Sequence, residues 1–333
     1  MLINKILLNY YSFGYSSGLI NDEENKFKKI NLNELISLSS ENKLKGIEFP
    51  FDRIYKFHNI DLGIKNLQNL IKKNIKVFVD FETLDYDYLF EVIPKLAKIG
   101  INIFRIKMNH LGKVFYGGNR YISSHFDNSL KNFKIILKKI YPLLKSNGTI
   151  AVIENHQDLH SSELKQIIED ISTDNFGINW DIGNAFSVCD TPESFFENTK
   201  HLIKNVHIKD YKISKSKKGI SLTRCKLGSG AVNFNNIFTK LKLIEPQLVS
   251  LSIELGAQIS RECHIKLEDY WEPYSNLNID KKNYTETVYE LSNDNTVKSD
   301  YEDGLRGRDL KKCEIEDVTV SINQINKILR NLN

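Results

Sequence analysis

Four polar side chains follow or end short apolar runs, and their types together suit a divalent metal ion. The stretch IAVIENHQD, residues 150–158, shows the pattern most clearly, because four apolar residues lead directly into a polar end. Three carboxylates and one imidazole stand at such positions: Glu154, Asp181, His207 and Glu254. Three carboxylates held together repel one another and lose their ionisation, and a divalent cation removes that difficulty. This ligand set suits Mn²⁺, Mg²⁺, Co²⁺ or Zn²⁺.

The elements that would position these residues alternate between strand and helix. Near-continuous apolar, β-branched runs are typical of parallel strands buried on both faces. We expect strands at residues 5–13, 46–50, 76–82, 101–108, 149–156, 177–184, 205–211 and 250–255. This alternation predicts the α/β class and a (β/α)8 barrel. The structural alternative is a doubly wound open sheet, which would normally carry a glycine-rich phosphate turn after its first strand, and the sequence has none there.

Amphipathic segments of helical length lie between the predicted strands. We expect helices at residues 31–43, 62–74, 88–100, 128–148, 161–172, 191–205, 235–244 and 322–332. Gly148 suits the end of one helix. Thr191 followed by Pro192 suits the start of another.

Residues 256–313 do not fit this alternation, because connections in compact domains are usually much shorter. The segment is polar, charged and rich in tyrosine, and it lies between the eighth strand and the last helix. We expect one barrel domain over residues 1–333, with this long loop over the barrel mouth as a lid, a dimer arm or a poorly ordered loop.

The active site of such a barrel lies at the C-terminal ends of its strands. Glu154, Asp181, His207 and Glu254 come from four successive predicted strands, so their side chains should converge on one point. Each alone has an ordinary explanation, because a carboxylate at a strand end is more often a cap or a salt-bridge partner. A histidine in an apolar strand is likewise more often a hydrogen-bonded core residue. Their coincidence is what indicates a site.

At these residues the sequence resembles the xylose isomerase-like TIM-barrel superfamily, and more narrowly the sugar phosphate isomerase/epimerase family. The matching pieces occur in the family's order: IENHQD (153–158), WDIGNA (180–185), VHIKDY (206–211), KLGSGAVNF (226–234) and SIELGA (252–257). The first half of the chain matches only by its strand and helix alternation and by GIEFP (46–50).

The resemblance implies one divalent metal bound by Glu154, Asp181, His207 and Glu254. It also implies that the two glutamates act as the acid/base pair of a ketose epimerase. An arginine beyond the seventh strand contacts substrate in the family, and Arg224 is the matching residue here.

The implied chemistry is removal of a proton next to a carbonyl group. A metal that chelates the carbonyl and an adjacent hydroxyl oxygen stabilises the resulting enediolate. One glutamate removes the proton, and the other can deliver one to the opposite face. We therefore expect a metal-dependent isomerase or epimerase acting on a sugar or sugar derivative.

Two departures from the family pattern keep a second activity open. Asn184 stands where many epimerases carry a histidine, and Asn233 stands where an acidic residue is frequent. Retro-aldol cleavage, decarboxylation and dehydration can use the same enediolate or enolate. The alternative is thus a lyase, decarboxylase or dehydratase acting on a sugar acid.

Other polar residues near the predicted mouth are candidates for substrate contact: Glu48, His110, His156, Lys209 and Arg224. Lys209 and Arg224 could hold a carboxylate or phosphate of the substrate, or form salt bridges instead. His110 and His156 could bond substrate hydroxyls or orient the metal ligands.

The bulk composition is that of an ordinary globular protein. The 333 residues are 41% hydrophobic, and a net charge of +4 from 46 basic and 42 acidic side chains does not argue for nucleic acid. The four cysteines are far apart, which we interpret as free thiols in a reducing compartment. No signal-peptide core and no stretch of roughly 18 apolar residues is present. We expect a cytoplasmic protein with a sugar or sugar-acid substrate, no nucleic-acid or membrane partner, and a homo-oligomer as a possible assembly.

Two further classes compete with the sugar enzymes. An endonuclease-IV-like DNA repair enzyme shares this barrel, but its three-zinc cluster needs more histidines at strand ends, where this chain has Glu48 and Asn184. A non-catalytic binding protein would have to keep three converging carboxylates without a metal, which is costly.

Overall fold

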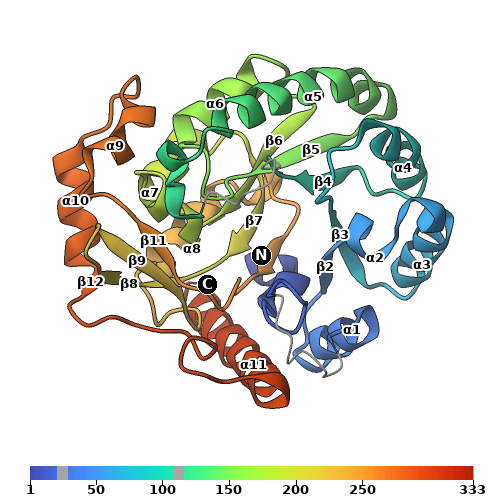
Figure 1. The fold of residues 1–333 in the computed structure, drawn as a ribbon. Helices are drawn as coiled ribbons and strands as arrows, with labels where there is room; N and C mark the ends of the chain where they lie inside the picture. The colour runs from blue at the N-terminus through green and yellow to red at the C-terminus, as the bar shows by residue number, and fades with distance from the viewer. Residues whose placement is uncertain (21–28, 109–115, 333) are drawn as a thin grey trace.

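The computed structural model describes residues 1–20, 29–108 and 116–332, which form a closed barrel surrounded by helices (Figure 1). Its parallel strands are hydrogen-bonded in the order β1, β10, β7, β6, β5, β4, β3, β2, which confirms the predicted (β/α)8 barrel. The strands overlap the predicted stretches: β1 (Ile6–Asn9), β2 (Gly46–Pro50), β3 (Lys76–Asp80), β4 (Ile103–Ile106), β5 (Ile150–Glu154), β6 (Phe176–Asp181), β7 (Ile203–Ile208) and β10 (Leu251–Ile253).

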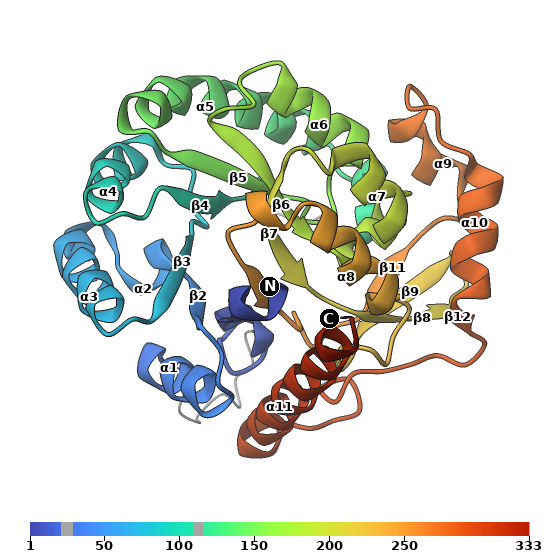
Figure 2. The same cartoon turned by 180° about the vertical axis from the view of Figure 1, so that it is seen from behind.

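Helices cover the outside of the barrel, as the view from behind shows (Figure 2). They are α1 (Leu32–Glu41), the short α2 (Phe51–Ile54), α3 (Ile60–Lys72), α4 (Tyr86–Lys98), α5 (Phe126–Asn147), α6 (Ser161–Glu169), α7 (Pro192–Thr199), α8 (Phe234–Leu243) and α11 (Gly307–Asn331). In the described part of the chain, no helix combines the length and the apolar character that crossing a bilayer requires.

The two predicted helix boundaries are confirmed. Gly148 ends α5 in the left-handed conformation, with φ 61° and ψ 37°, which glycine adopts without strain. The Thr191 side chain accepts a hydrogen bond from the backbone N–H of Ser194, and Pro192 begins α7.

A second, smaller sheet stands beside the barrel (Figure 1). It consists of β11 (Arg261–Cys263), β9 (Ile220–Arg224), β8 (Tyr211–Lys215) and β12 (Ser292–Asn293), in that order. β8 and β9 form an antiparallel hairpin just after β7, and β11 adds antiparallel to β9. The sheet therefore extends from the rim where β7 ends.

The segment predicted as a long loop, residues 256–313, carries secondary structure. It holds β11, α9 (Glu268–Trp271), α10 (Lys281–Glu290) and β12, and α11 begins at Gly307 rather than at residue 322. The prediction for the start of this helix is wrong because its first turns are highly charged. Its buried side is nevertheless clear in the structure, where Leu310, Glu314 and Val318 are all shielded from solvent.

Strand register places the candidate ligands at one rim of the barrel. Asp181 on β6 is the Cα partner of His207 on β7, and His207 is partnered in turn by Ser252 on β10. Glu154 ends β5, and Glu254 directly follows β10. Parallel strands end at the same rim of a barrel, so these residues share the mouth.

Trp180 lies on the side of β6 that faces the surrounding helices, because successive side chains of a strand point to opposite faces. It precedes Asp181 on β6, and its ring is fully buried. The indole stacks on Phe195 of α7, with ring centroids 6.1 Å apart and an interplanar angle of 1°, and it also contacts Phe196. Trp180 therefore packs between the barrel and α7.

We expect Trp180→Ala to lower the free energy of unfolding by about 3–5 kcal/mol, because it leaves a cavity between β6 and α7. Phe90→Ala is the control, since Phe90 on α4 is 56% exposed, and surface changes of this kind usually stay within about 0.5 kcal/mol. Urea unfolding followed by circular dichroism measures both. An equal decrease in the free energy of unfolding for the two variants would show that the packing of Trp180 against α7 does not stabilise the protein as expected.

Candidate metal centre and substrate pocket

The four predicted metal ligands lie together in the structure. Glu154, Asp181, His207 and Glu254 are buried, and each offers a ligand atom within 4.8 Å of those of the others. The barrel brings them together because β5, β6, β7 and β10 are consecutive neighbours in the sheet. This geometry supports the convergence that the sequence predicts.

A second acidic layer lies behind His207. Glu48 and Asp80 form another close group with the same imidazole. Glu48 Oε1 lies 2.5 Å from His207 Nε2, and Glu254 Oε2 lies 3.0 Å from His207 Nδ1. A carboxylate behind one ring nitrogen orients the other toward a metal, as in many histidine metal sites.

The charges around His207 set its protonation. Burial lowers the pKa of His207, but the carboxylates of Glu48 and Glu254 outweigh it and raise the pKa well above its ordinary value. The imidazole is therefore cationic when no metal is bound, and a metal at Nδ1 would displace that proton.

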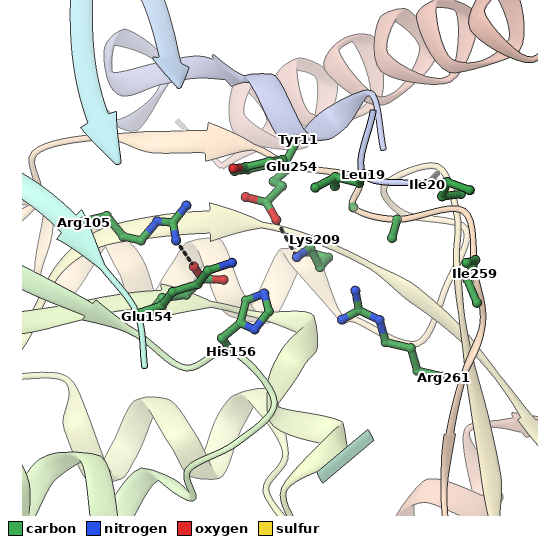
Figure 3. Close-up of a pocket in the computed structure, with 13 residues that line it drawn as sticks. Tyr11, Leu19, Ile20, Arg105, Glu154, His156, Lys209, Glu254, Ile259 and Arg261 are labelled. Atoms are coloured by element: carbon green, nitrogen blue, oxygen red, sulfur yellow. Dashed lines mark hydrogen bonds and ion pairs between the residues drawn. The ribbon is translucent and has the colours of Figure 1, made fainter. Parts of the chain in front are cut away.

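Lys209 connects two of the predicted ligands. Its Nζ donates to Asp181 Oδ2 at 2.5 Å. It also donates to Glu254 Oε1 at 2.7 Å (Figure 3). Burial raises the pKa of Asp181 to about 7 even though Lys209 opposes the shift. Burial also acts to raise the pKa of Glu254, but Lys209 and His207 hold it well below its ordinary value.

Asn184 supports Asp181 from the other side. Its Nδ2 donates to Asp181 Oδ2 at 2.7 Å, and its Oδ1 accepts from Gln157 Nε2 at 2.9 Å. Among the described residues, the buried Asp181 Oδ1 has no hydrogen-bond partner. The asparagine that departs from the epimerase pattern thus orients the carboxylate of Asp181 and leaves Oδ1 available to a cation.

Arg105 is a site residue that the sequence analysis missed. Its guanidinium is 1% exposed and lies 3.0 Å from both Asp80 Oδ2 and Glu154 Oε2. The available signal was an arginine inside the otherwise apolar strand IFRI (103–106). Arg105 holds one oxygen of Glu154 in place beside the pocket (Figure 3).

The balance of charge fits a divalent cation. Among the described residues, the two acidic groups contain five carboxyl groups, and three cations contact them. Burial raises the pKa of Asp80 well above its ordinary value, which reduces the excess of negative charge. The carboxylates are Glu48, Asp80, Glu154, Asp181 and Glu254, and the cations are Arg105, Lys209 and protonated His207. A buried excess of negative charge is costly, and a divalent ion at the four-ligand group would offset it.

A pocket opens above this group at the barrel mouth (Figure 3). Its enclosed volume is about 130 Å³, and the space that includes the part open to solvent is about 770 Å³. It is lined by Tyr11, Leu19, Ile20, Arg105, Lys107, Glu154, His156, Lys209, Glu254, Gly256, Ala257, Ile259 and Arg261. The segment after β10 thus contributes several residues to the wall.

The structure brings some predicted substrate-binding residues to the pocket and not others. His156 and Lys209 line it, whereas Glu48 lies behind His207 and contacts its imidazole. Burial and the nearby Lys107 and Arg261 hold the pKa of His156 well below its ordinary value, so its ring is neutral. The predicted contact at His110 lies outside the described residues.

Arg224 is not brought into this pocket. It ends β9, and its Nη1 lies 3.3 Å from Asp317 Oδ2 on α11. Arg224 instead lines a separate surface pocket with Lys212 and Lys226. The sequence placed Arg224 near the substrate because it gave no sign that the hairpin of β8 and β9 leaves the barrel rim.

Lys107 and Arg261 also line the pocket, and neither was among the predicted substrate contacts. Lys107 lies just beyond β4, two residues after Arg105, so both side chains can face the barrel interior. Arg261 begins β11, in the segment expected to be a loop. Asn233, the second departure from the family pattern, caps α8 by accepting from the backbone N–H of Asn236.

Residues 92–267 match the family described as xylose isomerase-like TIM barrel, which is more than half of the chain. The chain therefore belongs to the xylose isomerase-like TIM-barrel family. Within the described residues, the two acidic groups contain one histidine between them, His207. The DNA repair alternative would need a cluster with more histidines.

Individual relatives are distant. The chain is 23% identical over 228 residues to the uncharacterized protein YihM of Escherichia coli K12, covering 66% of each chain. It is 22% identical over 143 residues to the 3-oxo-isoapionate decarboxylase of Pectobacterium atrosepticum, covering 42% of this chain and 52% of that enzyme. The matches thus span less than two thirds of the length of either relative. The structure of the 3-keto-D-glucoside 4-epimerase YcjR from E. coli has a TM-score of 0.54 at 15% identity, over 86% of this chain and 98% of that one, which supports the shared fold.

We expect Lys209→Met to lower the melting temperature of metal-free protein and to enlarge the increase produced by Mn²⁺. Removing one partner of a buried ion pair typically costs about 3–5 kcal/mol, because the remaining charges are left uncompensated. Differential scanning fluorimetry with a chelator and with excess Mn²⁺ measures both effects. Lys212→Met on β8 is the matched control. The same Mn²⁺ effect in wild type and both variants would contradict the role of Lys209 as the counter-charge.

We expect His207→Ala to abolish Mn²⁺ binding and Glu48→Gln to weaken it by about 10- to 100-fold, since residues behind a histidine ligand commonly have effects of this size. Titration with Mn²⁺, with free ion detected by electron paramagnetic resonance, gives the affinities. Glu262→Gln is the control, because Glu262 lies on β11 outside both acidic groups. Unchanged affinity in His207→Ala would remove this imidazole from the ligand set.

Proposed function

We propose that the chain is a divalent-metal-dependent isomerase or epimerase that moves a proton next to the carbonyl of a sugar or sugar derivative. The observation that carries the proposal is the convergence of Glu154, Asp181, His207 and Glu254 within 4.8 Å of one another. Two of these residues, Glu154 and Glu254, also line the pocket. Ligands and candidate acid/base groups thus meet at one small-molecule site.

The proposed metal ligands are Glu154, Asp181, His207 and Glu254. A divalent ion held there would supply positive charge to the carbonyl oxygen and the neighbouring hydroxyl oxygen of the substrate. Asn184 and Lys209 would keep Asp181 oriented, and Glu48 would do the same for His207. The preferred ion among Mn²⁺, Mg²⁺, Co²⁺ and Zn²⁺ is a matter for metal analysis.

Glu154 and Glu254 are the proposed acid/base pair. In the barrel, β5 and β10 are separated by β6 and β7, so the two carboxylates approach the pocket from different sides (Figure 3). One can take a proton from a carbon atom, and the other can return a proton to the opposite face, which inverts that carbon. Lys209 and His207 keep Glu254 ionised, so Glu254 would enter the reaction without a proton, in the state that a base requires.

Related proteins support this chemical class without deciding the product. The printed names of two relatives describe an epimerase of a 3-keto-glucoside and a decarboxylase of a 3-oxo sugar acid. A decarboxylase or other lyase remains the second candidate, because Lys107 and Arg261 in the pocket suit a substrate that carries a carboxylate. The cytoplasmic location and the homo-oligomer stay predictions.

We expect Glu154→Gln and Glu254→Gln each to slow substrate proton exchange by about 10²- to 10⁴-fold, the usual contribution of a positioned acid/base group. The measurement follows deuterium incorporation by nuclear magnetic resonance in Mn²⁺-loaded protein, with ketoses and keto sugar acids in D₂O. Glu262→Gln should exchange like wild type. Exchange in both variants at the wild-type rate would rule out the proposed acid/base pair.

A further inference from the structure

Among the residues that the structure describes, the substrate pocket contains more cations than the two that pair with its carboxylates. Glu154 and Glu254 lie at its floor, where Arg105 and Lys209 contact them. Lys107 and Arg261 add further positive charge to the wall. In Figure 3, the Arg261 guanidinium points into the space beside His156 and Lys209.

Arg261 is held at the mouth by backbone pairing. Its Cα is partnered with Leu222 in the antiparallel pair of β11 and β9. The next residue along, Glu262, accepts a hydrogen bond on its carbonyl oxygen from Asn119 Nδ2 at 2.6 Å. The start of β11 is thus secured on both sides, so the guanidinium is placed by the sheet and not by a free loop.

Lys107 is a partly buried cation of the pocket wall. It has three carboxylates nearby: Glu154, Glu82 and Glu254. Within the described residues, no ion pair or side-chain hydrogen bond joins its Nζ to a carboxylate. Burial lowers the pKa of Lys107, and the neighbouring Arg105 lowers it further. An anion bound beside Lys107 would offset both effects, because an opposite charge stabilises the protonated amine.

The pocket wall also includes His156 and an apolar part. Leu19, Ile20, Ala257 and Ile259 supply apolar surface to the rest of the wall. The neutral ring of His156 adds no charge of its own. Lys107 and Arg261 both act electrostatically on His156, so an anionic group bound beside His156 would be near both cations.

We propose that Arg261 and Lys107 bind an anionic group of the substrate, so that the protein acts on a keto sugar bearing a carboxylate or a phosphate. This inference rests on the proposed function, because it assigns another group of the same substrate. Arg261 suits this task since its planar guanidinium can donate two parallel hydrogen bonds to either anion.

Three ketoses that differ only at the sixth carbon test the proposal: D-fructose, D-fructuronate and D-fructose 6-phosphate. Isothermal titration calorimetry measures their binding to the Mn²⁺-loaded protein and to the chelated protein. We expect at least one anionic ketose to bind about tenfold or more tightly than D-fructose, because hydrogen bonds to charged groups are the stronger ones. Comparing the two anions then identifies carboxylate or phosphate as the preferred group.

Variants connect that preference to the two cations. Arg261→Gln and Lys107→Gln should each weaken binding of the preferred anion by about 10- to 100-fold, and should change D-fructose binding little. Arg261→Lys should recover part of the loss, since it keeps the charge but not the paired hydrogen bonds. Arg308→Gln, on the exposed side of α11, is the matched control and should bind like wild type. Circular dichroism and melting temperatures check that each variant is folded.

Several results would overturn the inference. One is equal binding of D-fructose and both anions, another is no binding of either anion, and a third is equal weakening of all three ketoses in Arg261→Gln. The proposed function would be contradicted by a different set of results. Anion preference that depends on Arg261, without Mn²⁺ binding or proton exchange, would contradict the isomerase while the anion site stands. Proton exchange on D-fructose alone would support the isomerase and contradict the anion site.

Discussion

Buried negative charge at the C-terminal rim of the barrel is the constraint on which the rest of the site depends. Carboxylates from β2, β3, β5, β6 and the residue after β10 meet there with little access to water. Isolated ionised groups in such surroundings would be strongly destabilising. Arg105, Lys209 and His207 are placed to offset this charge, and each contacts two carboxylates. The same arrangement prepares a site for a divalent cation.

The barrel and the smaller sheet divide the work of building the pocket. Consecutive barrel strands deliver the proposed ligands and the acid/base pair to one point, because parallel strands end at the same rim. The hairpin of β8 and β9 then extends beyond that rim, and β11 adds to its edge and presents Arg261 to the pocket. Rigid strands therefore position the groups that would contact different parts of the proposed substrate.

The parts of the structure that sequence reasoning predicted are those that follow from local periodicity. Apolar runs of strand length marked the eight barrel strands, and polar residues at their ends marked Glu154, Asp181, His207 and Glu254. Neighbouring strands along the chain are neighbours in this barrel, so convergence could be inferred without coordinates. The helix boundaries at Gly148 and Thr191 depended on local backbone preferences and were equally accessible.

What sequence reasoning missed depends on contacts between distant segments. β11 and β12 are only three and two residues long, too short for an alternating pattern, and they exist because β8 and β9 offer edges to pair with. Arg261 reaches the pocket through that pairing, and Arg224 is directed to α11 by the same hairpin. Arg105 lay inside a predicted strand, but its role could not be inferred without the positions of Asp80 and Glu154, which it contacts.

The central claim is that the carboxylate group at the barrel rim holds one divalent ion. A crystal structure of the protein grown with Mn²⁺, with anomalous diffraction collected at the manganese edge, tests it most directly. The account predicts one strong anomalous peak among Glu154, Asp181, His207 and Glu254, with Lys209 displaced from at least one of its two carboxylates. A well-ordered structure with no peak there, and with Lys209 still bridging Asp181 and Glu254, would contradict it.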